Sequence, residues 1–315
     1  MTDDESRKDR GHVPSDRIDT VINLAIVVGL GVLLASLYAP MLLWLGHAAL
    51  SFEQLHNGGL IVLFALMVSL RRAILARPFR PEGNRLGIAL IAAGLGSLYL
   101  IPAQPVVALP MALLSFCLTF AGLSAFLFGA EGVRALLPAV TGILLLGILA
   151  GAAPWLDWPL RAVSARYSAA ILEYLGVDVA VAMQPGSPPE LLLFVKDRVF
   201  LVAAECNGFG LITSSLLVAA VLGFHYRIAW HAKAALFVFA LPLAVLFNAL
   251  RIVGISLMAT HVPLPYMLIH EGLGLLFYGA ALLLLWRLAS WRATPETRAR
   301  SRRKKARRGG SNRPE

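Results

Sequence analysis

The chain has 315 residues, is 58% hydrophobic, has a mean hydropathy of +0.73 and carries a formal net charge of +10. This composition excludes an ordinary soluble domain, and repeated apolar runs of about 20 residues are each long enough to cross a bilayer. The positive charge could indicate a nucleic-acid partner, but it is concentrated in residues 298–308, which read RARSRRKKARR. Because no aromatic side chains interleave with this run, we interpret it as a cytoplasmic tail beside anionic lipid and expect no nucleic acid as partner.

The sequence predicts an all-α polytopic membrane protein with about eight transmembrane helices. A polar cytoplasmic tail over 1–20 precedes a membrane domain over 21–290, and a basic tail over 291–315 follows it. The first apolar run is longer than the hydrophobic core of a signal peptide, so we expect it to be retained as a span. The predicted spans are 21–46, 58–76, 86–103, 107–128, 136–154, 206–224, 235–260 and 270–288.

The segment 155–205 is the one sizeable piece predicted outside the membrane. Pro154 and Pro159 indicate where the fifth span ends, and residues 158–175 can form an amphipathic helix at the interface. Residues 176–183 and 191–202 are rich in β-type side chains, and Lys196-Asp197 predicts a turn between two short strands. The resulting β-hairpin would lead directly into Cys206.

The distribution of basic residues predicts the orientation of the chain. On the eight-span scheme, 23 lysines and arginines fall on the side of the two termini and four on the opposite side, all four in 155–205. This bias predicts that both termini are cytoplasmic. The sixth, seventh and eighth spans then bring Cys206, Arg251 and His270 to the outer side of the membrane.

Cys206 is the strongest candidate for chemistry. It lies at a predicted helix N-terminus, which favours a thiolate, and Gly208 allows another backbone to approach closely. The polar residues Glu205 and Asn207 interrupt an apolar stretch without an evident structural need. The alternative is a buried structural cysteine, which is how we interpret Cys117, and no disulfide between the two is expected.

Arg251 and His270 complete the candidate site. A charged side chain within a span costs a few kcal/mol and needs a partner, which could be Asn248 one turn earlier. An arginine suits an oxyanion, although a structural ion pair is the alternative. His270 could be a helix cap, but beside a thiol it could act as an acid and base. Glu205 and Glu271 could orient this histidine or cap helix ends.

Three segments together resemble the exosortase/archaeosortase family, whose polytopic members carry a Cys, an Arg and a His at the outer face. They are AECNGFG at 204–210, NALRI at 248–252 and HEG at 270–272. His56-Asn57-Gly58 with Arg71-Arg72 after the second span is similar to an early segment of that family, and the likeness runs over roughly 40–290. The family commonly has Ser where this chain has Asn207, and Asn57 is inserted between its His and Gly.

The resemblance implies a cysteine endopeptidase/transpeptidase of the bacterial inner membrane. Its partners would be the lipid bilayer and membrane-anchored secreted proteins that end in a short motif, one membrane helix and a basic tail. Cys206 would be the nucleophile that forms a thioester, Arg251 would stabilise the oxyanion, and His270 would be the acid and base. No metal or other cofactor is expected, since no HExxH, Cys-x-x-Cys, P-loop or GxSxG motif occurs. The alternatives are a transporter or flippase component that binds an anionic substrate through Arg251, and a non-catalytic scaffold.

Overall fold

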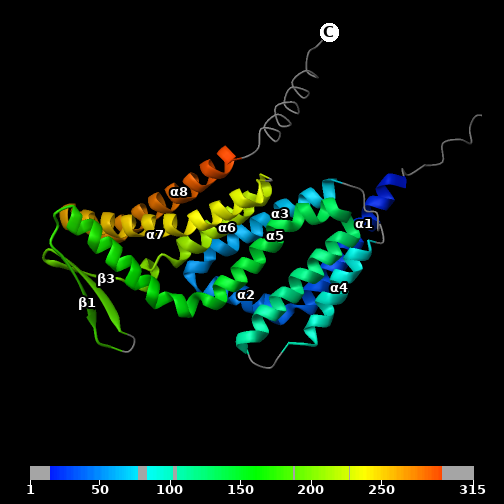
Figure 1. Ribbon diagram of the computed structural model, residues 1–315, viewed down its shortest axis with the longest axis horizontal. Helices are drawn as coiled ribbons and strands as arrows, with labels where there is room; N and C mark the ends of the chain where they lie inside the picture. Colours follow the sequence, from blue (N-terminus) through cyan, green and yellow to red (C-terminus); the bar gives the residue numbers. More distant parts are fainter. Residues whose placement is uncertain (1–14, 77–83, 102–104, 187–188, 227, 293–315) are drawn as a thin grey trace, which may run out of the picture. The chain divides into compact units, whose positions relative to one another are not determined.

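The structure is a computed structural model that describes residues 15–76, 84–101, 105–186, 189–226 and 228–292 (Figure 1). Within these residues the chain is mainly helical, with one small sheet. In the part of the chain that the structure describes, five helices are long and apolar enough to cross a membrane, or six if one bent pair counts as a span. The predicted fold class, an all-α polytopic membrane protein, is confirmed. The predicted tails, 1–20 and 291–315, lie largely outside the described residues.

The helices before residue 105 differ in length from the predicted spans. The first predicted span is a bent pair, α1 (Ser15–Leu37) and α2 (Ala39–Ser51), with an angle of 80° at the break. The next two spans correspond to α3 (Glu53–Ala76) and α4 (Arg85–Leu98). At 14 residues, α4 is shorter than the roughly 20 residues that a straight span needs.

The largest difference from the prediction is α5 (Pro105–Tyr174), which is 70 residues long. It takes in the predicted spans 107–128 and 136–154 and the predicted interfacial helix. Gly129 interrupts it with φ 63° and ψ −165°, so that two helices meet at a kink. The predicted end at Pro154 and Pro159 is wrong, because the helix continues through both. Proline fixes φ near the helical value, and a membrane helix tolerates the lost hydrogen bond when neighbouring groups satisfy the freed backbone.

The chain forms two compact units, and the first comprises residues 1–44 and 70–136. Here the Tyr38 hydroxyl lies 2.7 Å from the Ser115 hydroxyl and 2.9 Å from the Thr119 hydroxyl. A Cβ on Gly94 would lie 2.7 Å from the backbone nitrogen of Thr119, so glycine allows α4 and α5 to approach closely. Cys117 is buried in this unit, and neither it nor Cys206 forms a disulfide.

The second unit, residues 45–69 and 137–315, contains every candidate site residue. Its helices α6 (Phe209–His225), α7 (Trp230–His261) and α8 (Tyr266–Arg292) pack side by side (Figure 1). Their bounds follow the last three predicted spans to within several residues. A hydrogen bond of 2.7 Å from the Tyr278 hydroxyl to the Ser214 hydroxyl joins α8 to α6.

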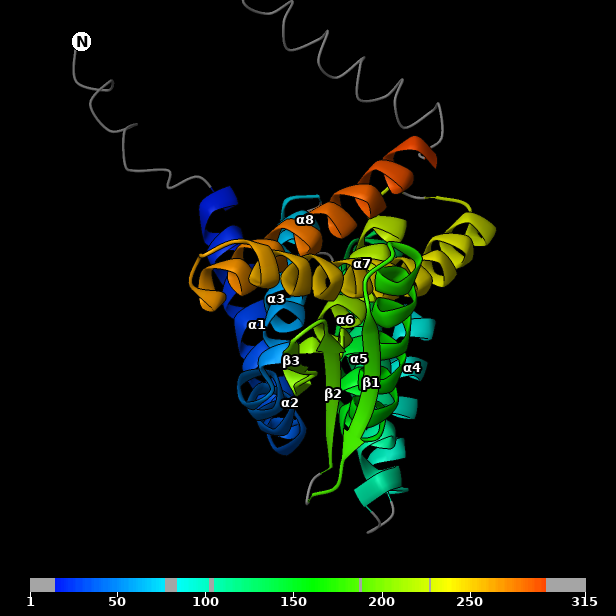
Figure 2. The same cartoon turned by 90° about the vertical axis from the view of Figure 1, so that its left-hand side faces the viewer.

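The predicted hairpin is present and gains one more strand. β1 (Val179–Gln184), β2 (Glu190–Val195) and β3 (Arg198–Leu201) form an antiparallel sheet in that order. The predicted turn, Lys196-Asp197, joins β2 to β3, and Lys196 adopts a left-handed φ of 53°. Figure 2 shows β1 and β3 on the two sides of the sheet.

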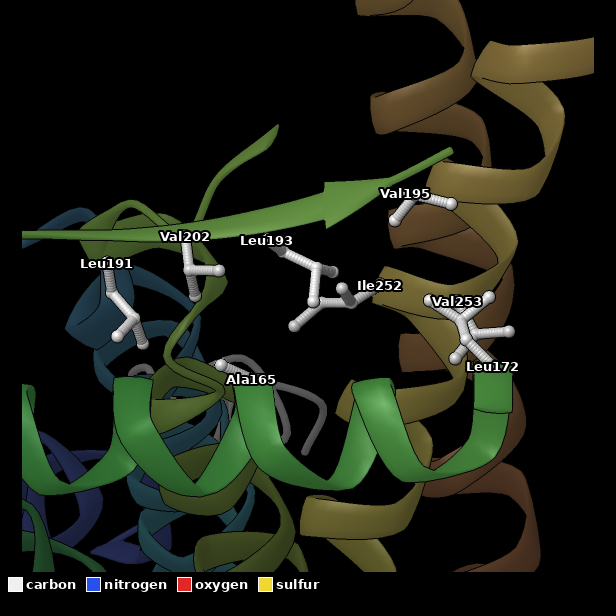
Figure 3. Close-up of a cluster of buried hydrophobic side chains, with 8 residues drawn as sticks. All are labelled: Ala165, Leu172, Leu191, Leu193, Val195, Val202, Ile252 and Val253. Atoms are coloured by element: carbon white, nitrogen blue, oxygen red, sulfur yellow. The ribbon is translucent and has the colours of Figure 1, made fainter. Parts of the chain in front are cut away.

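One face of the sheet packs on the end of α5 and on α7. Alternate residues of β2 are buried, which places Leu191, Leu193 and Val195 on one face. In Figure 3 these side chains point toward α5, and Leu193 and Val195 lie beside Ile252 and Val253 of α7. This cluster fixes the sheet that precedes Cys206 against the helix that carries Arg251.

Candidate functional site

Cys206 lies in a short loop whose backbone is held from three helices. A 3-10 turn, Ala204–Cys206, follows β3 and passes through Gly208 into α6. All five carbonyls from 203 to 207 accept hydrogen bonds. The donors are Cys206 N to Ala203 O, Asn207 N and Gln54 Nε2 to Ala204 O, Arg251 Nη1 to Glu205 O, Asn248 Nδ2 to Cys206 O, and Ser164 Oγ to Asn207 O. The side-chain donors come from α3, α5 and α7, so the loop has little freedom to move independently of these helices.

Gly208 is the residue that allows Asn248 to reach this loop. Its φ is +79°, a conformation that glycine adopts without strain. A Cβ on Gly208 would lie 2.8 Å from both Cγ and Nδ2 of Asn248. The close approach predicted at Gly208 is therefore present, but the group that approaches is the side chain of Asn248 and not another backbone.

Asn207 has a structural role that the sequence does not indicate. It is 1% exposed, and its Oδ1 accepts a hydrogen bond of 2.7 Å from Phe209 N at the start of α6. Its Nδ2 donates to Asp157 Oδ1 on α5, also at 2.7 Å. Arg161 forms an ion pair with the same carboxylate. The interpretation of Asn207 as having no structural need is therefore wrong.

The structure brings Cys206, Arg251 and His270 together. The Cys206 sulfur lies 3.9 Å from His270 Nε2, and Arg251 Nη2 lies 3.0 Å from the same nitrogen. A guanidinium has only donors, so Nε2 must be the acceptor. The contact therefore corresponds to the neutral tautomer of His270 that carries its proton on Nδ1, in which the Nε2 lone pair is the acceptor on the side of the thiol and the guanidinium.

Arg251 is only partly satisfied in this arrangement. Besides His270, it donates at 3.4 Å to Glu205 O, while its buried Nε has no hydrogen-bond partner among the described residues. A Cβ on Gly274 would lie 3.4 Å from both Nε and Nη2. Glycine at this position thus leaves space beside two donors of the guanidinium.

Two cavities meet at Glu205 and His270, which line both. The first, of about 350 Å³, is lined by polar and charged groups that include Gln54, Asn57, Arg251 and His270. The second, of about 660 Å³, is lined by β3, Cys206, Tyr266, Met267 and His270. Cys206 thus lines the second cavity and Arg251 the first, while His270 lines both.

The remaining predicted site residues take other positions. Among the described residues, Asn248 does not hold Arg251 as predicted, because its amide donates to Ser164 Oγ and Cys206 O. Glu205 and Glu271 are exposed and line the first cavity, and in this part of the chain neither accepts a hydrogen bond from His270. No group of three His, Cys, Asp or Glu that could hold a metal occurs in the residues that were described.

Sequence reasoning missed three residues that hold the loop: Gln54, Asp157 and Ser164. Asp157 carried a detectable signal, since Arg161 one turn later indicates an ion pair on one helix face. Gln54 lies two residues before the predicted His56-Asn57-Gly58 segment. Ser164 carried no signal, because a serine in a helix commonly bonds to its own backbone.

Comparison with known protein families gives one match. The family model described as transmembrane exosortase matches residues 49–287, about three quarters of the chain. The match includes Cys206, Arg251, His270 and every residue that holds the loop. No curated protein and no solved structure matches the chain.

Proposed function

The chain belongs to the transmembrane exosortase family, and on this premise we propose that it is a cysteine endopeptidase/transpeptidase acting on secreted proteins. The family places it, in general terms, among membrane transpeptidases that sort proteins. The finer proposal is cleavage of a C-terminal signal, made of a short motif, a membrane helix and a basic tail, at the outer face of the inner membrane. The observation that carries it is the contact of Cys206 and Arg251 with one nitrogen of His270.

The first step uses the neutral imidazole as a base. His270 Nε2 takes the thiol proton of Cys206, and the thiolate attacks the carbonyl carbon of the scissile peptide bond. The carbonyl oxygen becomes an oxyanion as the carbon–sulfur bond forms. The distance of 3.9 Å between sulfur and nitrogen suits this role, because catalytic hydrogen bonds are often long until substrate binds.

Proton transfer also changes the partner of Arg251. Once Nε2 carries a proton it no longer accepts from the guanidinium, and two donors then face each other. The oxyanion is a better acceptor, and Nη2 of Arg251, released from His270, can donate to it. The same proton transfer that activates the thiol therefore releases the guanidinium to stabilise the charge on the substrate.

The tetrahedral intermediate then breaks down to a thioester, which an acceptor attacks. The carbon–nitrogen bond breaks, His270 donates its proton to the leaving amine, and a thioester joins the substrate to Cys206. An acceptor bearing an O–H or N–H group attacks the thioester, and its proton passes through His270 to the departing sulfur. Cys206 returns to the thiol, and the substrate carries its new carboxyl-end bond.

The experiment that tests this function follows a tagged secreted protein with a C-terminal membrane helix and basic tail, in cells with and without this chain. We expect a shorter tagged product only when the chain is present. Hydroxylamine added to membranes should divert that product to a C-terminal hydroxamate of similar size, detectable by mass spectrometry, because it attacks a thioester. A shortened product whose carboxyl end hydroxylamine never modifies would contradict the thioester route.

The orientation is a prediction of its own. A reporter fused after Glu315 should be active in the cytoplasm, and the same reporter inserted at Gly186 should be active outside it. The reason is the excess of lysine and arginine on the side of the termini. The measurement is a paired reporter assay, and detection of both fusions on one side would remove the proposed outer-face site.

Gly208→Ala should impair processing far more than Gly176→Ala. Both glycines have a left-handed φ, +79° and +76°, so alanine strains the backbone similarly at each. Only at Gly208 would the added Cβ also meet Asn248, at 2.8 Å, and displace the hydrogen bond to Cys206 O. We expect a loss of roughly ten-fold or more in the processing rate for Gly208→Ala, since small displacements of reacting groups are costly. Equal rates for the two variants, at matched protein levels, would show that this contact does not position the thiol.

A further inference from the structure

β3 is an edge strand with one side unpaired by the sheet. The strand order is β1-β2-β3, so β2 covers only one edge of β3. Val199 and Leu201 are 55% and 47% exposed, although both are apolar. An exposed apolar edge next to a reaction centre is a candidate for pairing with another extended chain.

The register shows which backbone groups face outward. Val202 N donates to Leu191 O at 2.8 Å, so Val202 directs its backbone groups toward β2. Alternate residues share this direction in an antiparallel pair, which leaves the N–H and C=O of Val199 and Leu201 pointing away from the sheet. Among the described residues, no backbone group of another element bonds to either of them. They offer two donors and two acceptors.

This free edge lines the same cavity as the thiol. The cavity of about 660 Å³ is bounded on one side by residues 198–201 and on the other by Leu264, Tyr266 and Met267. Cys206 and His270 line it as well. A chain paired with β3 therefore lies in continuous space with the Cys206 sulfur, and the apolar side chains around it suit a peptide with apolar residues.

Resting on the function proposed above, we propose that β3 binds the substrate by strand addition. The occupant is the extended segment of the secreted protein that precedes its C-terminal membrane helix, hydrogen-bonded to the backbone of Val199 and Leu201. Backbone pairing is largely independent of side chains, so it orders the segment while leaving sequence discrimination to the surrounding pockets. The ordered segment delivers the scissile carbonyl to Cys206.

A pair of proline variants tests the backbone contact. Val199→Pro removes an N–H of β3 that points outward, so no hydrogen bond within the sheet is lost. Proline is tolerated at such outward-facing positions of edge strands. Val181→Pro is the matched control on β1. Lys196 N donates to Asp178 O, so Asp178 directs its backbone groups toward β2. Because this direction alternates along the strand, the N–H of Val181 points outward from the other edge of the sheet. We expect Val199→Pro to lower the processing rate at low substrate roughly ten-fold or more, as one hydrogen bond and close pairing are lost. Val181→Pro should stay within about two-fold of the unmodified chain by the same estimate.

Crosslinking tests the geometry without catalysis. In a Cys117→Ala/Cys206→Ala background, Val199→Cys is paired with single cysteines placed in turn along the reporter segment that is processed in the assay above. After addition of an oxidant, we expect the strongest disulfide adduct at one reporter position, weaker adducts two residues to either side and none at its immediate neighbours, because side chains alternate across a strand and a disulfide spans only facing residues. Val181→Cys in the same background should give none.

The outcomes separate the two proposals. Strand addition would be overturned if Val199→Pro processed normally or if adducts formed at all reporter positions alike. It would also be overturned if Val181→Cys gave adducts equally, or if Val199→Cys gave dimers of this chain with itself. The last result would make a second copy of this chain the occupant. These results leave the transpeptidase intact as long as Cys206→Ala is inactive, whereas processing by Cys206→Ala would overturn the transpeptidase itself.

Discussion

Replacing Cys206 with alanine is expected to abolish processing of the tagged substrate while the protein still inserts and folds. The thiol is half-buried, but its backbone carbonyl is held by Asn248, so the loop does not depend on the side chain. Loss of a nucleophile that acts as one unit with its base lowers kcat by roughly five to six orders of magnitude. The remaining activity would be below detection in a size-shift assay. Cys206→Ser should be nearly as inactive, because a hydroxyl needs stronger base activation than a thiol.

The control for this variant is Cys117→Ala. Cys117 is also a helical cysteine, but it is 7% exposed in the first compact unit, among the core residues of α5. Its removal should leave processing within about two-fold, since it deletes one small side chain of the core. Normal processing by Cys206→Ala at matched protein levels would instead favour the transporter or scaffold interpretation.

Arg251→Lys is expected to have the second largest effect, a fall of roughly 10²–10³ in kcat, which is typical for loss of an oxyanion donor. Lysine keeps the positive charge but replaces a planar fork of five donors with a single ammonium. In this site the fork bridges two groups, since Nη2 contacts His270 Nε2 while Nη1 contacts Glu205 O. One ammonium cannot hold both and then turn to the substrate oxygen.

The measurement must distinguish chemistry from folding. Arg134→Lys is the matched control, because that guanidinium is exposed and, within the described part of the chain, its ion pair is with Glu131 three residues earlier, at 3.5 Å. We expect unchanged rates for Arg134→Lys, and for Arg251→Lys a lower kcat with KM and thermal stability close to those of the unmodified chain. A loss of stability that parallels the loss of rate would assign Arg251 a structural role.

The sequence was a good guide where one strong local pattern decides the structure. The spans near α6, α7 and α8 follow from uninterrupted apolar runs, and the turn at Lys196-Asp197 follows from two polar residues between β-type runs. The three site residues stand out because each is a reactive or charged group at the edge of, or inside, such a run. A guanidinium within an apolar helix needs a partner, and His270 is that partner.

The sequence was a poor guide where contacts between residues far apart in the chain determine the structure. Asn207 binds Asp157 across 50 positions of the chain, and Gln54 binds Ala204 O across 150, which no local periodicity encodes. Proline normally ends a helix, yet Pro154 and Pro159 lie inside α5. Strand β1 falls in the predicted β-type run 176–183, but its pairing with β2 depends on residues that are distant in the sequence, which that run alone does not encode.

The five bonded carbonyls of the cysteine loop have a consequence for how the chain can vary. Fixing one residue costs about 1–2 kcal/mol of conformational entropy, and in this loop that cost is met when the protein folds. None of the substrate's binding free energy is then spent on ordering the nucleophile, and it remains for distorting or aligning the peptide. The same arrangement makes the thiol sensitive to sites remote in the chain: a change at Gln54, Ser164 or Asn248 reaches it through the loop backbone. Variants that tune reactivity are therefore to be sought on the inner faces of α3, α5 and α7, at positions that touch no substrate.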